Sequence, residues 1–356
     1  MNFAGFDIGG AHVKFATTSG DSQQIAFPIW KDKDRLGEIL QRLSRDVEQQ
    51  SPIGVTMTAE LADCFEDKKA GVEFVVNAVQ DVFEDHHPLY YRTDGAMCSA
   101  SVAIRDWQLV AASNWHAIGC LAFDEDSSFR SGFVFDVGST TTDIIPVRSG
   151  RPVIGKQDDL GRLSNGQLYY GGIGRTPVCS LVDRIESDNG PVSIAKEFFA
   201  SMRDVFIWRN ELPAAESDFD SADGRPNSKL GAGKRLARML CADLSSIDAS
   251  LVDLLSLQAR NQLVDGISKS LVRVVSSHPD VPLTFVTFGA GAWLAEEVVL
   301  QVFGDGLDCE YNDGKDQVQP TVRSFDENPL INQTAAALAV AKMRQQVFEQ
   351  SLQPNE

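Results

Sequence analysis

The chain has 356 residues, of which 32 are basic and 50 acidic, so that its formal net charge is −18 at pH 7. This length is typical of two domains or one large one, and a content of 43% hydrophobic and 23% charged residues excludes bulk disorder. The acidity argues against nucleic acid and against an anionic membrane as partners, because both are polyanions. We therefore expect a small-molecule ligand, and a phosphorylated one needs backbone donors or a metal ion to offset the negative field.

The first residues and the cysteines favour a cytoplasmic protein. Residues 1–7 contain no basic stretch before an apolar core and do not resemble a signal peptide. Apolar runs such as 335–341 fall far short of the roughly 20 residues of a membrane helix. The absence of a CxxC pair favours reduced thiols over disulfides or a zinc site, and the six cysteines stand singly at positions 64, 98, 120, 179, 241 and 309.

Strand and helix patterns alternate over residues 1–125. Three short strands, separated by turns that contain glycine, are followed by a helix with one apolar face and by further strand–helix alternation. The predicted order is βββαβαβα. The predicted segments are strands 3–8, 12–18, 23–29, 52–57 and 89–92 and helices 35–49 and 71–83.

The pattern then restarts. Asp136 ends an apolar strand and precedes Gly138 by two positions, as Asp7 precedes Gly9. We interpret the two aspartates, 136 − 7 = 129 positions apart, as equivalent points of two related halves. The remaining predicted elements are helices 193–211, 234–243, 251–277 and 293–303, strand 283–288, a loop at 213–228, and a terminal helix 332–350 that packs on the first half.

The first motif runs from Asp7 to Lys14 and includes the paired glycines Gly9 and Gly10. Glycines after a strand let backbone N–H groups approach an anion, since no Cβ stands in the way. Asp7, at the carboxyl end of the strand, can hold a hydrated Mg²⁺ that bridges to phosphate. A plain hairpin turn is the simpler explanation of this motif alone. We count Gly9, Gly10 and Lys14 as candidate phosphate-binding residues.

The second motif strengthens the phosphate interpretation. Asp136 is followed by Gly138 and by the hydroxyl residues Ser139, Thr140 and Thr141. Hydroxyls and turn amides can bind phosphate oxygens, although a Thr-rich strand with ordinary cross-strand pairs has the same pattern. Two such loops that face each other hold a diphosphate from both sides, with the two aspartates as candidate catalytic residues and metal ligands.

A third motif, Gly289-Ala290-Gly291, follows a predicted strand and precedes a predicted helix. This arrangement brings a helix N-terminus and bare backbone close to a ligand. A lone Gly-x-Gly is weak evidence, but after two phosphate loops in one chain it completes a specific set.

Together these motifs resemble the superfamily of acetate and sugar kinases, chaperone ATPases and actin. The stretch 136–143 is similar to its hydantoinase/oxoprolinase branch, and 56–65, 112–117 and 170–178 are similar to the tetrahydromethanopterin-linked C1-transfer proteins of that branch. The resemblance implies an α/β fold with two duplicated actin-like (ribonuclease H-like) domains around an interdomain cleft. The implied domains are residues 1–128 plus 330–356 and residues 129–329.

The same resemblance implies a transferase of methanofuran-type cofactor biosynthesis. Such an enzyme binds an aminomethylfuran diphosphate, joins its methylene carbon to the phenol oxygen of γ-glutamyltyramine, and releases pyrophosphate. Amides, hydroxyls and Mg²⁺ stabilise the leaving group, and the phenol, whose pKa in water is ~10, needs a base. Ala11 stands where kinases of the superfamily usually have Thr or Ser, which argues against ATP-dependent phosphotransfer.

The residues that would act on the phenol are less specific. Glu60 and Asp63 follow a predicted strand, where catalytic groups of open α/β sheets lie, but Glu60 also fits a helix-start acid that complements the dipole. Asn114 and His116 either line the pocket or cap and pack a helix. Arg175 either binds a phosphate or carboxylate or is a solvated helix-start arginine. The candidate bases are Glu60, Asp63 and His116, and the candidate substrate-binding residues are Thr58, Asn114, Gly171, Gly172, Arg175, Gly289 and Gly291.

Two other interpretations stay open. An ATP-dependent small-molecule kinase or a hydantoinase-like ring hydrolase would consume ATP, which is expected as a cofactor only in that case. A nucleotide-sensing or assembly protein of the same fold would catalyse no reaction, but the sequence contains no basic helix-turn-helix region to support it. The oligomeric state is left open, with a homodimer as one option.

Overall fold

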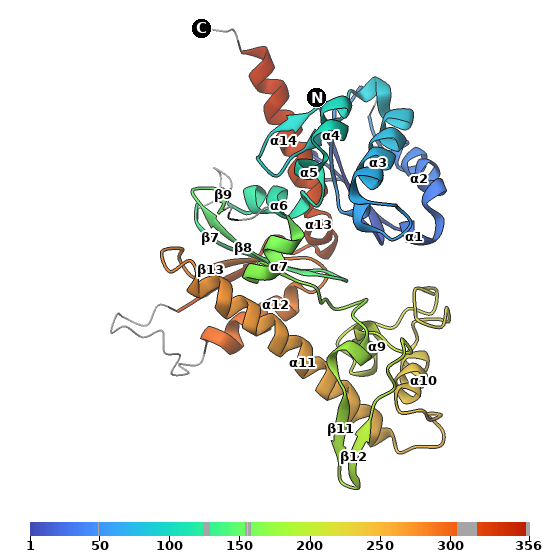
Figure 1. Ribbon diagram of the computed structural model, residues 1–356. Helices are drawn as coiled ribbons and strands as arrows, with labels where there is room; N and C mark the ends of the chain where they lie inside the picture. The colour runs from blue at the N-terminus through green and yellow to red at the C-terminus, as the bar shows by residue number, and fades with distance from the viewer. Residues whose placement is uncertain (49, 124–128, 154, 156–157, 305–318, 354–356) are drawn as a thin grey trace.

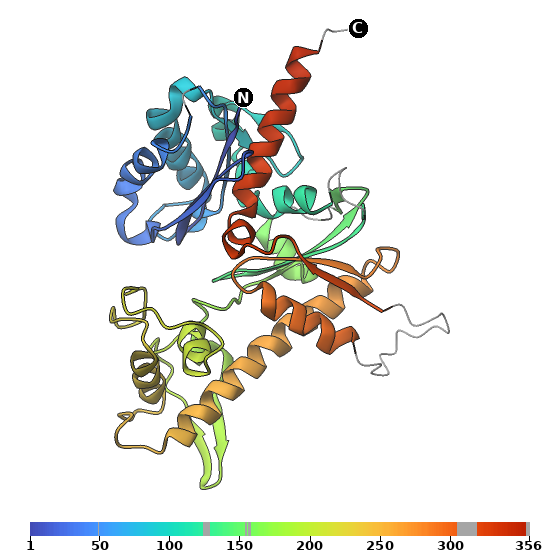
Figure 2. The same ribbon diagram turned by 180° about the vertical axis from the view of Figure 1, so that it is seen from behind.

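The computed structural model describes residues 1–48, 50–123, 129–153, 155, 158–304 and 319–353. Two mixed β-sheets, one in each half of the chain, form the centre of an α/β fold. In Figure 1 the first half is blue and cyan, the second sheet lies next to it, and a yellow-green group of short elements lies at the far end of the long helix α11 (Ala249–Ser276). Figure 2 shows the C-terminal helix α14 (Ala335–Leu352) running along the first sheet.

The first sheet has six strands in the order β3-β2-β1-β4-β5-β6. β1 (Ala4–Ile8) is antiparallel to β2 (His12–Thr17) and parallel to β4 (Ile53–Met57), so an N-terminal hairpin continues into parallel crossovers. The predicted order βββαβαβα is confirmed, except that the short strand β6 is inserted after β5. The other elements are β3 (Ser22–Ala26), β5 (Leu89–Tyr91), β6 (Met97–Cys98), α1 (Ile29–Asp32), α2 (Leu36–Ser44), α3 (Lys68–Phe83), α4 (Ala100–Arg105), α5 (Trp107–Val110) and α6 (Asn114–Ala122).

The second sheet repeats this central arrangement. β7 (Gly132–Val137) is antiparallel to β8 (Thr142–Arg148) and parallel to β13 (Thr284–Phe288), in a sheet of order β10-β8-β7-β13-β14. A hairpin followed by a parallel neighbour in both sheets confirms the predicted duplication of an actin-like β/α unit. The other elements of this half are β9 (Arg151–Pro152), β10 (Leu168–Tyr169), β14 (Thr321–Ser324), α7 (Asp159–Asn165), α8 (Val178–Leu181), α12 (Ala292–Phe303) and α13 (Pro329–Gln333).

Between α8 and α11 the prediction of one long helix over 193–211 is wrong. A two-stranded hairpin, β11 (Arg184–Ser187) with β12 (Gly190–Ser193), occupies the start of this segment, and only α9 (Met202–Trp208) is helical. α9 begins at a reciprocal capping box, in which Ser201 and Asp204 satisfy each other's backbone N–H groups. The cap fixes the start of the helix, and residues 194–200 before it are in neither a helix nor a strand.

The rest of the segment between α8 and α11, called the helical subdomain below, agrees with the predicted pattern. α10 (Lys229–Met239) begins five residues before the predicted start at 234, because the side chain of Ser228 accepts a hydrogen bond from the Gly231 N–H and caps the helix. The predicted loop 213–228 contains neither helix nor strand, and a single bridge between Ala215 and Asn227 closes it.

Each sheet has its own apolar core, and a third cluster joins the halves. In this third cluster Trp115 and Ile118 of α6 and Val340 of α14 pack with Val134 and Ile145 of the second sheet. α14 also packs on β1, β2 and β4, as predicted for the terminal helix. The two halves are therefore joined by buried side chains and not only by the chain itself.

Glycines bring α14 into backbone contact with the first sheet. A Cβ built on Gly5 would collide with the carbonyl oxygen of Ala337, and one on Gly54 would collide with that of Val340. These positions of β1 and β4 admit no side chain, because the helix backbone lies directly on the strands. β1 carries Asp7 two residues later, so this packing also fixes the strand end that matters for the site.

None of the helices in the described ranges combines the length and apolarity needed to cross a membrane. The five cysteines within those ranges are free thiols, and Cys309 lies outside the described residues.

We expect Gly5→Ala to destabilise the protein by about 1–3 kcal/mol, since the added methyl group must displace α14 from β1. Urea unfolding measures the change. Gly37→Ala is the matched control, because Gly37 lies within α2 and a Cβ there meets nothing within 4 Å. The control should be neutral or more stable by up to about 1 kcal/mol. Equal stability of both variants would contradict the close packing.

Candidate active site

Two hairpin turns with the same backbone pattern form the centre of the site. Asp7 pairs across the first hairpin with Lys14, and Asp136 pairs across the second with Asp143. Each turn closes through an equivalent hydrogen bond of 2.9 Å, from the Gly9 N–H to the His12 carbonyl and from the Gly138 N–H to the Thr141 carbonyl. The two predicted phosphate loops are therefore structurally equivalent, but one has a lysine where the other has an aspartate.

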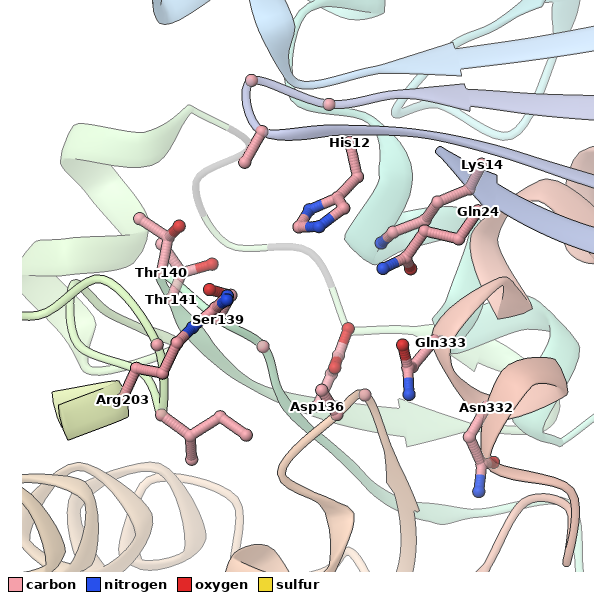
Figure 3. A pocket seen from close by; sticks show the side chains of 18 of the residues that line it. His12, Lys14, Gln24, Asp136, Ser139, Thr140, Thr141, Arg203, Asn332 and Gln333 are labelled. Carbon is pink, nitrogen blue, oxygen red and sulfur yellow. The ribbon is translucent and has the colours of Figure 1, made fainter. Parts of the chain in front are cut away.

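A cavity of about 340 Å³ separates the two turns and is called the hairpin cleft below. Figure 3 shows His12, Lys14 and Gln24 projecting into it from the first half, opposite Asp136 and Ser139 of the second. Most of the predicted residues meet here. Those that line it are Asp7, Gly9, Gly10, Lys14, Thr58, Asn114, Asp136, Gly138, Ser139, Thr140, Thr141 and Gly289.

The hairpin cleft contains buried carboxylates and one lysine. Asp7 Oδ2 lies 3.2 Å from Lys14 Nζ, whereas Asp7 Oδ1 is buried without a hydrogen-bond partner among the described residues. Burial raises the pKa of Asp136 to about 7, and the carboxylates of Asp143 and Asp7 add to this effect while Lys14 opposes it. Burial alone would lower the pKa of Lys14, but Asp7 and Asp136 outweigh it and raise the pKa.

The two aspartates fit a metal ion that also binds phosphate. Mg²⁺ usually binds one or two carboxylates and completes its shell with waters and phosphate oxygens. Asp7 Oδ1, which is buried and unpaired, and the neighbouring Asp136 supply such a donor set. Within the described ranges no group of three or more His, Cys, Asp or Glu residues is arranged to hold a metal. Metal binding by Asp7 and Asp136 stays a prediction.

The third motif, residues 289–291, packs against Asp136 and Val137 at the end of β7. Gly289 has a φ of +83°, and a Cβ at this position would collide with Asp136 Oδ1. Gly291 donates its N–H to the Val137 carbonyl at 2.8 Å, and a Cβ there would lie 2.6 Å from Val137 Cγ1. Gly289 lines the hairpin cleft, but Gly291 lies behind it and supports the strand end.

The segment 171–175 forms backbone hydrogen bonds with the second turn. The Ile173 N–H donates to the Gly138 carbonyl at 3.0 Å, and the Arg175 N–H donates to the Ser139 carbonyl at 2.8 Å. A Cβ on Gly172 would collide with the Gly138 carbonyl oxygen. Gly171 and Gly172, predicted to bind substrate, line neither cavity described here, and Gly172 instead packs against the second turn.

A second cavity of about 460 Å³ adjoins the hairpin cleft and is called the side pocket below. It contains the predicted Glu60, Asp63 and Arg175, and the Arg175 guanidinium stacks on the Trp30 ring at 3.9 Å from its centroid. This stacking joins the two halves across the pocket. The residues that line both cavities are Gly10, Ala11, Thr58, Asn114, Thr140, Thr141 and Asp143.

Glu60 is buried in the wall of the side pocket. Both of its carboxylate oxygens lack a hydrogen-bond partner among the described residues, and burial raises its pKa to about 7. The N–H groups of Glu60 and Ala112 favour the charged form, but their geometry falls short of hydrogen bonds. The helix-dipole explanation has little support, because Glu60 lies in a single 3₁₀ turn, Ala59–Leu61. Asp63 is exposed at the rim.

His116 lies apart from both cavities. The residue is 4% exposed, its Nδ1 lies 2.7 Å from the Tyr91 hydroxyl oxygen, and burial lowers its pKa to about 4. Asn114, two residues earlier on α6, lines both cavities. His116 is thus positioned as a core residue, and its position does not support a role as base.

Sequence reasoning missed several residues that line the hairpin cleft. His12 is two residues before Lys14 on β2, so strand alternation could have found it, and Gln24 pairs with Lys14 on the neighbouring strand. Burial lowers the pKa of His12 to about 4, with Lys14 and Arg203 adding to the effect. Other missed polar residues, among them Arg203, Asp218, Asn332 and Gln333, come from distant segments and carry no local signal.

Two duplicated β/α domains with a cleft between their first hairpins define an actin-like protein. The chain belongs to the hydantoinase/oxoprolinase family, whose model matches residues 53–304. It is 34% identical over 315 residues to the (4-{4-[2-(gamma-L-glutamylamino)ethyl]phenoxymethyl}furan-2-yl)methanamine synthase of Methanocaldococcus jannaschii, covering 86% of this chain and 89% of that protein. The synthase of the same name from Methanococcus vannielii is 32% identical over 145 residues, 41% of this chain and 65% of the relative. Among solved structures, a non-polymerising MamK mutant bound to AMPPNP is similar with a TM-score of 0.45, 12% identity, and coverage of 96% and 98%.

The raised pKa of Asp136 predicts how the stability of the folded protein depends on pH. An unfolded aspartate titrates near 4, so the folded protein binds the extra proton between about pH 4 and 7, and stability falls as the pH rises through that window. Asp136→Asn removes this penalty. Its stability relative to the parent should therefore increase by about 1–3 kcal/mol between pH 5 and pH 8 in urea unfolding, while it binds Mg²⁺-pyrophosphate more weakly. A pH-independent difference would mean that Asp136 is ionised throughout.

Proposed function

We propose that this protein joins an aminomethylfuran diphosphate to the phenol of γ-glutamyltyramine and releases pyrophosphate, as a step in methanofuran-type cofactor biosynthesis. The match to the Methanocaldococcus jannaschii synthase over 86% of this chain carries the proposal. The name of that relative describes an aminomethylfuran joined through a methylene–oxygen bond to a phenol with a γ-glutamylaminoethyl group. Two adjoining cavities that share residues suit a reaction between two substrates.

The hairpin cleft is the proposed diphosphate site. Lys14, the N–H groups of both turns and the hydroxyls of Thr140 and Thr141 are the groups that would bind the leaving pyrophosphate. Asp7 and Asp136 would hold Mg²⁺, which neutralises charge on the departing phosphates. The buried carboxylates disfavour a bare anion, so pyrophosphate should bind with its metal and only weakly without it.

The side pocket is the proposed phenol site. As the methylene carbon bonds to the phenol oxygen, its bond to the diphosphate oxygen breaks, and the phenol proton must move to a base. Glu60 is the proposed base, since its pKa of about 7 lies nearer to that of a phenol than the pKa of an exposed carboxylate does. Arg175, stacked on Trp30, would bind the carboxylate of the γ-glutamyl group through its guanidinium.

The direct test is mass spectrometry of a reaction that contains the furan diphosphate, γ-glutamyltyramine and Mg²⁺. We expect the ether and one pyrophosphate per ether, with no requirement for ATP, because Ala11 leaves the first turn without the kinase hydroxyl. Product that appears only with ATP, together with ADP, would instead support the kinase interpretation. Omitting Mg²⁺ should reduce the rate.

Glu60→Gln should lower kcat by about 10²- to 10⁴-fold with little loss of thermal stability. A base must be deprotonated, so the activity of the parent should increase as the pH rises through about 7. The variant should lack this limb of the pH–activity profile. Steady-state kinetics from about pH 5.5 to 9 measures both effects.

Asp63→Asn is the matched comparison, since Asp63 lies in the same pocket but is exposed. If Glu60 is the base, this variant should keep a kcat within about tenfold of the parent and the same pH limb. Near-normal kcat in Glu60→Gln together with a large loss in Asp63→Asn would transfer the role of base to Asp63.

A further inference from the structure

Arg203 brings a third part of the chain to the hairpin cleft. It is the second residue of α9, and its backbone N–H donates to the Gly174 carbonyl at 3.1 Å, directly behind the second turn. Its side chain lines the cleft, and Figure 3 shows it on the same side as Ser139. The helical subdomain therefore places a guanidinium next to the residues proposed to bind phosphate.

Two carboxylates of the loop 213–228 hold this guanidinium. Arg203 Nη1 lies 2.5 Å from Asp218 Oδ2, and Nη2 lies 3.9 Å from Asp220 Oδ2. Asp218 itself lines the hairpin cleft. The side chain of Arg203 is 20% exposed, so this ion pair faces the cavity and is open to competition from an anion that enters it.

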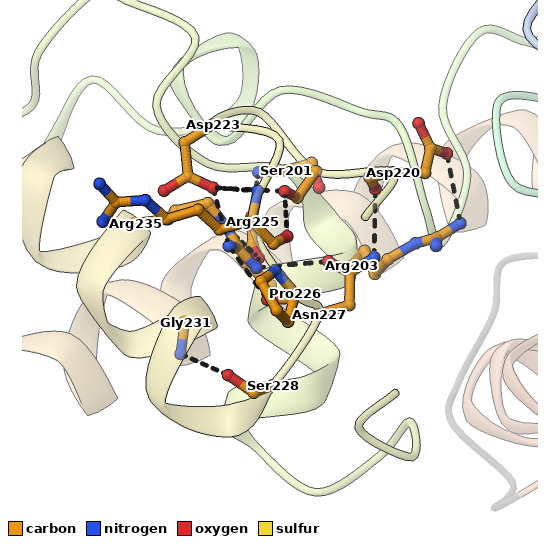
Figure 4. A network of polar contacts seen from close by, with 12 residues as sticks. Ser201, Arg203, Asp220, Asp223, Arg225, Pro226, Asn227, Ser228, Gly231 and Arg235 are labelled. Carbon is orange, nitrogen blue, oxygen red and sulfur yellow. Dashed lines mark hydrogen bonds and ion pairs between the residues drawn. The ribbon is translucent and has the colours of Figure 1, made fainter. Parts of the chain in front are cut away.

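A second arginine already anchors the same loop. Arg235, with a side chain that is 0% exposed, bonds to Asp204 at 2.7 Å and to Asp223 at 3.1 Å, and Asn227 next to it donates its N–H to the Asp218 carbonyl. Figure 4 shows Arg235 and Asp223 at one side of this network and Arg203 with Asp220 at the other. Because buried contacts fix the loop, Arg203 is not required for the same purpose.

We propose that Arg203 binds the diphosphate of the substrate and exchanges Asp218 for phosphate oxygens when it does so. The inference rests on the proposed function and adds a specificity residue to it. A guanidinium forms paired, charge-assisted hydrogen bonds with phosphate, and these are stronger than a partly exposed pair with a carboxylate. Asp218 then competes with the substrate for Arg203, so the acidic residue lowers the affinity that the basic one provides.

This exchange predicts opposite effects for the two partners. Arg203→Gln should weaken binding of Mg²⁺-pyrophosphate by about 10- to 100-fold, and Asp218→Asn should strengthen it by about two- to fivefold. The Asn side chain keeps an oxygen that can accept the Asp220 N–H bond now made to Asp218 Oδ1. The double variant should bind no more tightly than Arg203→Gln, since the gain requires the arginine. If the pair only held the loop, Asp218→Asn would leave binding unchanged or weaker.

Titration calorimetry with pyrophosphate and Mg²⁺, on the four proteins and on Arg238→Gln, tests the proposal. Arg238 pairs with Asp223 in the same subdomain but does not line the cleft, so its variant removes one positive charge there and should bind within about twofold of the parent. Circular dichroism and thermal unfolding establish that each variant is folded. Parent-like affinity in folded Arg203→Gln, or unchanged or weaker binding in folded Asp218→Asn, would overturn the proposal. Pyrophosphate binding that follows the prediction without ether formation by mass spectrometry would reject the proposed function and leave the anion site standing.

Discussion

The site depends on two aspartates at the ends of equivalent strands, of which Asp7 is buried and Asp136 partly buried. Transferring a carboxylate from water into the protein is costly unless a cation or hydrogen-bond donors compensate, and Lys14 forms a direct ion pair with Asp7. Asp136 has no such partner within the described residues and is held against a glycine with positive φ. The two neighbouring carboxylates are therefore electrostatically unfavourable, and a metal ion that binds together with an anion would relieve this.

The duplicated hairpins are equivalent in backbone and different in charge. The position opposite the strand-end aspartate is Lys14 in the first half and Asp143 in the second. Asp143 forms an ion pair with Arg162, whose guanidinium stacks on Trp115 of α6 at 4.3 Å from the ring centroid. The first hairpin therefore supplies a cation to the cleft, while the second supplies hydroxyls, and the cation of the second half, Arg203, comes from α9. This division suits a ligand that is held asymmetrically between its two ends.

Features that depend on a short stretch of sequence could be predicted, and features that depend on tertiary packing could not. The strand–Asp–x–Gly pattern located both hairpins, because a strand and its turn are local. The geometry of helix α6 explains why Asn114 lines the cavities and His116 does not. Two residues that are two positions apart differ by about 200° around a helix, so only Asn114 faces the cavities. Arg203 reaches the cleft only because its subdomain folds against the second turn. The pattern around it predicted one long helix over 193–211, of which the structure contains only the short α9.

The central claim is that a diphosphate binds between the two hairpin turns. A crystal structure of the protein with Mg²⁺ and pyrophosphate tests this most directly. The account predicts density for pyrophosphate between the Gly9–Gly10 turn and the Ser139–Thr141 turn, with the metal at Asp7 and Asp136. Pyrophosphate bound elsewhere, or a cleft in which Lys14 and both aspartates make no contact with the ligand or metal, would contradict it.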